Sequence, residues 1–246
     1  MQVIGIIPAR YASVRFPGKP LANIQGKTMI RRVYEQVCKC TALSEVVVAT
    51  DHQEIFDHVG EFGKVVMTDP AHPSGTDRCM EAFSIIGKGR FGPQDVVVNI
   101  QGDEPFVNPL QIEMLIGLFA DEHCQIASLV KKIEKREELF SENVVKVVVG
   151  LDKRAIYFSR SPIPHYRDLP RELWVQKGRF YKHLGMYGYR VSVLEKITRL
   201  APGELEKAES LEQLRWIENG YTIHVNETGL EHLSVDTPED LNKIGK

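Results

Sequence analysis

The chain has 246 residues and a formal net charge of −2, with 43% hydrophobic and 26% charged residues. This composition is typical of a soluble globular protein, and the length allows one large domain with a continuous core. Because the charge is near neutral and the apolar run at residues 3–7 is too short for a signal peptide or a membrane span, we expect a cytoplasmic protein without nucleic-acid or membrane partners.

A basic loop at residues 8–20 follows this apolar run, which predicts a buried first strand. The loop carries Arg10, Arg15 and Lys19, and no Asp or Glu precedes Glu35 in the chain. So strong a local imbalance, in a chain with a net charge near zero, favours binding of a small polyanion such as a nucleotide.

Two common phosphate-binding motifs are excluded at this loop. A Walker motif ending at residues 26–28 would need a glycine at position 21, which is Leu21. The dinucleotide fingerprint needs three spaced glycines after the first strand, and none precedes Gly18. The sequence therefore favours neither a P-loop NTPase nor a conventional dehydrogenase.

Strands and helices alternate up to residue 100. Runs of β-branched residues predict buried strands, and apolar residues at helical spacing predict helices, the first one capped by Thr28. The expected strands are 46–49, 65–67 and 96–100, and the expected helices are 28–40, 53–62 and 76–86. This pattern predicts a doubly wound α/β fold with a mostly parallel sheet covered on both faces.

Three loops are expected to meet at one edge of this sheet, because ligands of such folds bind beyond the carboxyl ends of the strands. They are the basic loop, the segment Ser74-Gly75-Thr76 and the turn at residues 101–105.

From about residue 125 the pattern changes to short apolar segments separated by charged stretches. We expect strand-like segments at 126–130, 144–149 and 155–158, a Pro-rich loop at 161–178 and a helix at 206–219. The predicted organisation is an α/β core of residues 1–124 plus 220–246, with an inserted mixed α+β lobe of residues 125–219.

Four cysteines lack the C-x-x-C spacing of a zinc or redox site: Cys38, Cys40, Cys79 and Cys124. We expect reduced structural thiols rather than a zinc site or a set of disulfides.

Two aspartates are candidate ligands of a hard cation. Asp103 directly follows the predicted strand 96–100, where a carboxylate can hold a cation in the crevice. Asp236 precedes a last helix that Thr237 is expected to cap, with Pro238 at its first position. For Asp236 the residues alone support a capping role and a metal-binding role equally.

The basic loop, A-R-Y-A-S-V-R-F-P-G-K-P-L at residues 9–21, resembles the signature loop of cytidylyltransferases that make CMP-sugars from CTP and an acidic keto-sugar. Among these it is most similar to the family that acts on 3-deoxy-manno-octulosonate (Kdo). The resemblance covers nearly the whole chain and is weakest at residues 167–179. The loop departs at Val14, where Thr is common, and at Phe16, where Leu is common.

The resemblance implies a Rossmann-like nucleotidyltransferase fold and the transfer of CMP from CTP to the anomeric 2-hydroxyl of Kdo, for lipopolysaccharide biosynthesis. It implies Mg²⁺ bound through Asp103 and Asp236, with Arg10 and Lys19 as catalytic cations at the triphosphate. It further implies sugar binding by the inserted lobe and a homodimer formed through it.

Substrate contacts are also carried over from the resemblance. The nucleotide side would include Ser74, Gly75 and Gln101, while Arg78 would meet the base or stabilise its loop. The residues implied as sugar contacts are Arg160, His183, Tyr187, Glu212 and Gln213. Without the resemblance, each of these has an ordinary structural interpretation, as a surface, strand or helix-face residue.

Three other functions stay open at this point. The acceptor could be a related acid sugar, such as an amino-substituted Kdo or a nonulosonate, because the same loop motifs would serve it. A hexose-1-phosphate nucleotidyltransferase would need a second basic cluster for the sugar phosphate, and none is seen in the sequence. A catalytically silent nucleotide-sugar binder would have no need of two metal carboxylates.

Overall fold

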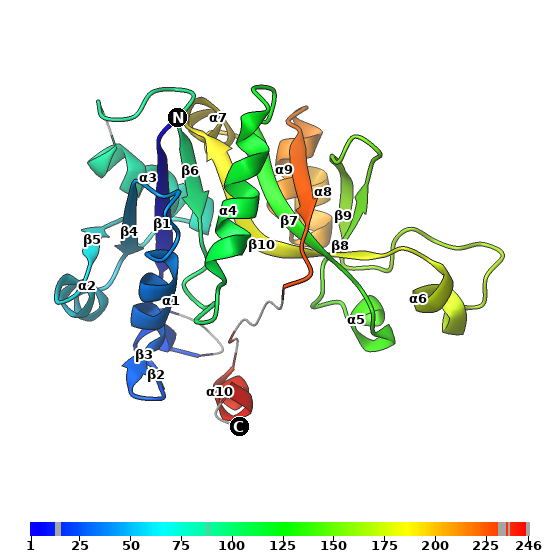
Figure 1. Ribbon diagram of the computed structural model, residues 1–246, viewed down its shortest axis with the longest axis horizontal. Coiled ribbons are helices and arrows are strands. Elements are labelled where there is room, and N and C mark those ends of the chain that lie inside the picture. Colours follow the sequence, from blue (N-terminus) through cyan, green and yellow to red (C-terminus); the bar gives the residue numbers. More distant parts are fainter. Residues whose placement is uncertain (13–15, 88, 231–234, 236, 245–246) are drawn as a thin grey trace.

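The computed structural model describes residues 1–12, 16–87, 89–230, 235 and 237–244. Within these residues a nine-stranded sheet forms the centre of the molecule, in the order β11-β7-β10-β6-β1-β4-β5, with β8 and β9 joined through β10 (Figure 1). A two-stranded hairpin of β2 (Asn23–Ile24) and β3 (Lys27–Thr28) lies outside it. None of the described helices is both long and apolar enough to cross a membrane.

The first half of the chain builds the parallel part of the sheet, as predicted. Its four strands are β1 (Val3–Ala9), β4 (Glu45–Thr50), β5 (Lys64–Met67) and β6 (Val96–Asn99). Strand β1 pairs in parallel with β4 and β6, and β4 pairs in parallel with β5. The helices between and after these strands are α1 (Met29–Val37), α2 (Gln53–Gly60), α3 (Gly75–Ile86) and α4 (Pro109–Gly117).

Both faces of the sheet are covered, which explains the continuous apolar strands. Val3 and Ile7 of β1 pack with α1, α2 and α4 on one face. Ile4 and Ile6 point to the other face, toward α3, α7 (Val191–Ile197) and α9 (Gln213–Glu218). The predicted doubly wound α/β class is therefore confirmed.

The second half extends the same sheet. Strand β10 (Tyr181–Arg190) lies antiparallel between β6 and β7 (Ile126–Lys132), and β11 (Ile223–Glu227) pairs in parallel with β7. The segment expected to form the inserted lobe thus contributes β7 and β10 to the central sheet. The division into core and lobe stays a prediction.

One end of the molecule carries the remaining elements of the second half (Figure 1). The hairpin of β8 (Lys146–Val149) and β9 (Ala155–Ser159) joins the start of β10 through β8. Near it lie α5 (Arg136–Phe140) and, within the predicted Pro-rich loop, the short helices η3 (Arg171–Leu173) and α6 (Trp174–Lys177).

Two helices lie elsewhere in the described chain. The short helix η2 (Leu118–Ala120) follows α4, and α10 (Pro238–Ile244) is the last described helix.

The predicted helix at 206–219 is wrong in one respect, because the chain forms two helices there. Helix α8 (Glu204–Glu209) ends at Ser210, whose φ of 52° is left-handed, and α9 begins at Gln213. This break turns Glu212 toward α3 instead of leaving it on the face of a continuous helix.

The last helix begins at Pro238, directly after Thr237, as predicted, while the cap by the Thr237 side chain stays a prediction because this hydroxyl donates to Asp240. Thr237 directly precedes Pro238, and its N–H and hydroxyl donate to Asp240 Oδ2 at 3.0 and 3.1 Å. All four cysteines are unpaired thiols, and three of them are buried.

Candidate active site

The candidate site lies at the edge of the sheet where β1 and β6 end and α3 begins. The basic loop leaves β1 at this edge, and the turn at 101–105 leaves β6 there. Gly102 lets these segments touch, since an added Cβ would lie 2.6 Å from the Pro8 carbonyl oxygen. A Cβ on Gly75 would lie 3.5 Å from the Pro8 ring. The three predicted segments therefore converge around Pro8.

An ion pair joins the basic loop to the acidic turn. Lys19 Nζ lies 2.7 Å from Asp103 Oδ2, and the two side chains are 12% and 31% exposed. Lys19 begins the short helix η1 (Lys19–Leu21), directly after Gly18, whose φ is 68°. Arg10, which directly follows β1, is exposed. Two residues predicted for different roles, a triphosphate cation and a metal ligand, are thus in direct contact.

Asp103 offers a suitable environment for a hard cation. Its carboxylate is partly exposed, so waters and phosphate oxygens could complete the octahedral coordination that Mg²⁺ prefers. Val235 donates its N–H to the Asp103 carbonyl oxygen at 3.0 Å, which places the neighbour of Asp236 beside this turn. Asp236 itself lies outside the described residues. Among the residues that the structure does describe, no three acidic, histidine or cysteine side chains form a metal-binding group.

The Ser74-Gly75 segment forms the start of α3. Ser74 caps the helix, because its Oγ accepts the Asp77 N–H at 3.1 Å. The segment is fixed further by the short contact between His72 Nε2 and Glu81 Oε2, at 2.5 Å. Helix N-termini carry partial positive charge, so this end of α3 suits an anionic or polar ligand group.

Arg78 is buried inside the fold and stabilises the loops around it. Its Nη1 donates to Thr68 Oγ1 at 2.5 Å and its Nη2 to Asp51 Oδ2 at 2.7 Å, with the side chain 0% exposed. His52, which follows Asp51 in the chain, stacks its ring on the Tyr11 ring of the basic loop, with the two ring centroids 3.9 Å apart. Of the two roles expected for Arg78, base contact or loop stabilisation, these contacts fit the second.

The predicted sugar residues of β10 lie next to the end of β6. Gln101 Nε2 donates to the Gly185 carbonyl oxygen at 3.0 Å, at a bulge where the β10–β7 register shifts. His183 Nε2 lies 2.9 Å from Ser128 Oγ, and the His183 ring contacts Tyr187. Bulges often redirect side chains at functional sites, and this one separates His183 from Tyr187.

Two buried polar atoms near this bulge have no partner among the described residues. They are the Tyr187 hydroxyl and Asn99 Oδ1, on residues that face each other across β10 and β6. Buried polar groups are normally hydrogen-bonded, so an unpaired pair at a strand end is typical of a site that a ligand completes. Burial also raises the pKa of the Tyr187 hydroxyl well above its ordinary value, so that it stays a hydrogen-bond donor.

Arg160 lies at the end of β9, with its guanidinium held by backbone carbonyls. Nε donates to Glu209 O at 2.8 Å, Nη1 to Glu142 O at 3.0 Å and Nη2 to Ser210 O at 3.3 Å. Within the described chain no carboxylate pairs with the guanidinium, so its charge is not neutralised. Buried Lys146 donates to the Arg160 carbonyl oxygen and fixes the backbone there.

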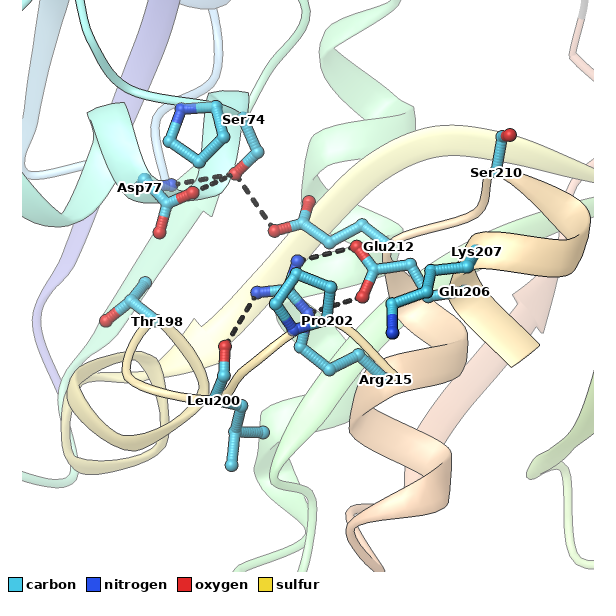
Figure 2. A pocket seen from close by; sticks show the side chains of 11 residues that line it. Ser74, Asp77, Thr198, Leu200, Pro202, Glu206, Lys207, Ser210, Glu212 and Arg215 are labelled. Atoms are coloured by element: carbon cyan, nitrogen blue, oxygen red, sulfur yellow. Dashed lines mark hydrogen bonds and ion pairs between the residues drawn. The ribbon is translucent and has the colours of Figure 1, made fainter. Parts of the chain in front are cut away.

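Glu212 connects the sugar side to the nucleotide side. Its Oε1 lies 2.9 Å from Ser74 Oγ (Figure 2), and its Oε2 lies 2.8 Å from Thr76 Oγ1. Burial raises the pKa of the Glu212 carboxyl despite these hydrogen bonds. Glu212 also lines a pocket of about 530 Å³ with Ser74, and Gln213 beside it is buried.

Sequence reasoning missed several residues that shape this site. Asn99 is the one polar residue in the strand 96–100, a signal that could have identified it. Asp51 shows no such signal, because its role depends on Arg78, a partner distant in the chain. The structure brings the predicted residues to one edge of the sheet, except for Arg78, which is internal, Arg160, which lies after β9 against Glu209 and Ser210, and Asp236, which is not described. Their contacts with substrates stay predictions.

The fold and this site define a nucleotide-binding α/β protein of the nucleotidyltransferase class. Solved structures agree at the level of the fold: a cytidylyltransferase from Leptospira borgpetersenii superposes with a TM-score of 0.62 at 16% identity, covering 100% of this chain and 85% of that one. A much closer likeness is to the structure of CMP:2-keto-3-deoxy-manno-octonic acid synthetase complexed with CTP. Its TM-score is 0.91 at 40% identity, over 100% of this chain and 97% of that one.

Sequence comparison identifies the family. The cytidylyltransferase family model matches residues 4–225. A 3-deoxy-manno-octulosonate cytidylyltransferase of Cytophaga hutchinsonii is 51% identical, over 99% of this chain and 96% of its own length. One of Parabacteroides distasonis is 53% identical, over 99% and 96%. The chain therefore belongs to the cytidylyltransferase family, in the branch of the 3-deoxy-manno-octulosonate cytidylyltransferases.

Proposed function

We propose that this chain transfers CMP from CTP to the anomeric 2-hydroxyl of Kdo, releasing pyrophosphate, for lipopolysaccharide biosynthesis. The names of its relatives support this acceptor, and a solved relative, 40% identical over the whole chain, binds CTP. On the chain itself, the observation that carries the proposal is the Lys19–Asp103 pair at the carboxyl edge of β6. The pair brings together a cation that could bind phosphate and a carboxylate that could bind a metal ion, which supports the proposal.

The chemistry needs no protein nucleophile. The sugar 2-hydroxyl oxygen forms a bond to the α-phosphorus of CTP, and the bond from that phosphorus to the bridging oxygen breaks. The hydroxyl loses its proton, and negative charge moves to the departing pyrophosphate. Arg10 and Lys19 lie where they can stabilise that charge electrostatically, which is the main contribution of proteins to phosphoryl transfer.

Mg²⁺ is the proposed cofactor, with Asp103 and Asp236 as its protein ligands. A site with one or two carboxylates, completed by substrate phosphates and water, is the usual arrangement for this ion. When bound, Mg²⁺ would neutralise phosphate charge and make the attacking hydroxyl more acidic.

The acceptor is proposed to bind between β10 and the turn after β9. Arg160 has five N–H groups on its guanidinium and uses three on carbonyls, so two remain for the acceptor carboxylate. The Tyr187 hydroxyl and the Asn99 carbonyl oxygen can pair with sugar hydroxyls. His183 lies on β10, the strand that carries Tyr187, and Gln213 lies on α9.

Pyrophosphate release measured with CTP, Mg²⁺ and a panel of acid sugars tests the proposal. Release with Kdo, and weaker release with amino-substituted Kdo and neuraminate, is the expected result. Faster release with one of the related acids would replace Kdo as the acceptor. Binding of CTP without release for any acceptor would favour the silent nucleotide-sugar binder.

We also propose a homodimer, formed through the segment 125–219. Leu151 and Ile156 of the β8–β9 hairpin are exposed apolar residues that such an interface would cover. Light scattering of the purified protein would give twice the chain mass, and a monomer mass at working concentration would contradict the interface.

A further inference from the structure

A cluster of two carboxyl groups and three hydroxyl groups lies where α9 meets the start of α3. Ser74 Oγ accepts the Asp77 N–H and lies 2.6 Å from Asp77 Oδ2 and 2.9 Å from Glu212 Oε1. Thr76 Oγ1 lies 2.8 Å from Glu212 Oε2 and 3.4 Å from the Tyr189 hydroxyl. Figure 2 shows the Ser74 side chain between the two carboxyl groups.

These contacts require one more proton than the hydroxyls can supply. The Ser74 hydroxyl has one proton, and its shorter contact is with Asp77. The Thr76 proton serves Glu212 Oε2, and the Tyr189 proton serves Thr76. The remaining contact, between Ser74 Oγ and Glu212 Oε1, needs a proton on one of the two carboxyl groups, and burial, which raises the pKa of Glu212, favours Glu212 as the one that carries it. A protonated Glu212 satisfies every contact at once.

The charged groups around Glu212 also disfavour its ionised form. From α3, Asp77 is the nearest anion, while the thiol of Cys79 is neutral and its pKa is raised by burial. From β10, Tyr187 and Tyr189 present neutral phenols. Arg215 of α9 is the one facing cation among the described neighbours.

That cation is already neutralised by another carboxylate. Arg215 Nε and Nη2 donate to Glu206 Oε2 and Oε1 at 2.6 and 2.5 Å, and Nη1 donates to Leu200 O at 3.0 Å (Figure 2). The N-terminus of α3 favours an anion, and Asp77 already occupies its first turn. Desolvation of the Glu212 carboxyl by burial is the largest cause of its raised pKa.

We propose that Glu212 is held as an uncharged carboxylic acid that donates its proton to Ser74 and so fastens α9 to the first turn of α3. The geometry of the free protein carries this proposal. One consequence of this proposal rests in addition on the proposed function. Because the acceptor is an acid, a neutral Glu212 keeps the sugar side free of a charge that would repel the acceptor carboxylate.

The test is a ¹³C NMR titration of the side-chain carboxyl groups in the full chain without substrates. We expect the assigned Glu212 carboxyl to titrate well above the ordinary value for a glutamate side chain, about 4.3. Titration of Glu212 at that ordinary value would overturn the proposal. The measurement involves no catalysis, so its outcome is independent of whether the chain transfers CMP to Kdo.

A variant at Asp77 tests the proton count. In Asp77→Asn the Ser74 proton is released from its carboxylate partner and can serve Glu212, so the Glu212 titration should move to lower pH. A Glu212 titration that does not move would contradict the shared hydroxyl. Comparing KM for Kdo with KM for CTP across the same pH range tests whether a neutral Glu212 favours binding of the acceptor carboxylate. Only KM for Kdo should rise as Glu212 ionises.

Discussion

Lys19 and Asp103 form an ion pair, 2.7 Å long, between two segments that are 84 residues apart in the chain. The pair spans the gap between the loop after β1 and the turn after β6. On the proposed function, the triphosphate would compete with Asp103 for the ammonium group and would leave the Asp103 carboxylate available to a cation.

Replacement of Lys19 by Ala should therefore weaken CTP handling much more than acceptor binding. Loss of a charge-assisted hydrogen bond costs about 1.5–3 kcal/mol, which corresponds to a roughly 10- to 100-fold lower kcat/KM for CTP. Lys39→Ala is the matched control, since Lys39 is an exposed lysine whose ammonium donates to Gln36 Oε1. Steady-state kinetics with each substrate varied in turn decides this; an unchanged CTP dependence would show that Lys19 does not contact the triphosphate.

Asp103→Asn should raise the Mg²⁺ concentration needed for half-maximal activity and lower kcat at ordinary Mg²⁺. An amide oxygen is a weaker ligand for a hard cation than a carboxylate, and the variant also loses the ion pair with Lys19. A Mg²⁺ titration of pyrophosphate release measures both effects. Near-normal turnover at ordinary Mg²⁺ would exclude Asp103 as a metal ligand.

The sequence predicted the parallel half of the fold well, because its signals are local. Apolar runs such as 46–49 and 96–100 and the Thr28 cap lie within the elements that they define. The break at Ser210 was missed because Leu211 and Leu214 continue the apolar spacing across it. A left-handed residue leaves no periodic signal.

For the site, the sequence predicted which segments meet and not how their side chains pair. Arg78 bonds Asp51, 27 residues away, and Glu212 bonds Ser74, 138 residues away. Such pairs depend on how the sheet brings loops together, and a single sequence carries no record of it. The same holds for Asn99, whose unpaired oxygen becomes visible only opposite Tyr187.

Glu212 should also make the stability of the protein depend on pH. The pKa of its carboxyl is raised in the folded state, so the folded protein holds this proton more tightly than the unfolded chain does. The resulting stabilisation is complete below the unfolded pKa of about 4.3 and is lost as pH rises through the folded pKa. Denaturant unfolding of the wild type and of Glu212→Gln at several pH values measures it: the difference between the two should change over this range, and parallel curves would contradict the raised pKa.

Arg78→Met should destabilise the protein by about 3–5 kcal/mol, because it leaves the Asp51 carboxylate inside the fold without its partner. The double variant Asp51→Asn with Arg78→Met should recover part of this loss, since no buried charge remains. If Arg78 acts only through the loops, CTP affinity should recover with stability. Calorimetric measurement of CTP binding to the double variant distinguishes the two roles of Arg78. Recovery of stability without recovery of CTP affinity would indicate a direct contact of Arg78 with the base.

The Glu206–Arg215 pair should control the position of Glu212. The pair is bidentate, its side chains are only 15% and 8% exposed, and it joins α8 to α9 across the break at Ser210. Arg215→Met leaves the Glu206 carboxylate without its cation, with the Gly203 N–H as its remaining donor among the described residues, and should cost about 3 kcal/mol of stability. Because α9 also carries Gln213, we expect KM for Kdo to rise several-fold while KM for CTP changes less.

The control for this prediction is Lys207→Met, which removes an exposed ion pair with Glu204 on α8 and should change neither KM value. Equal increases of both KM values in Arg215→Met would point to general loosening of the fold instead of displacement of the sugar side.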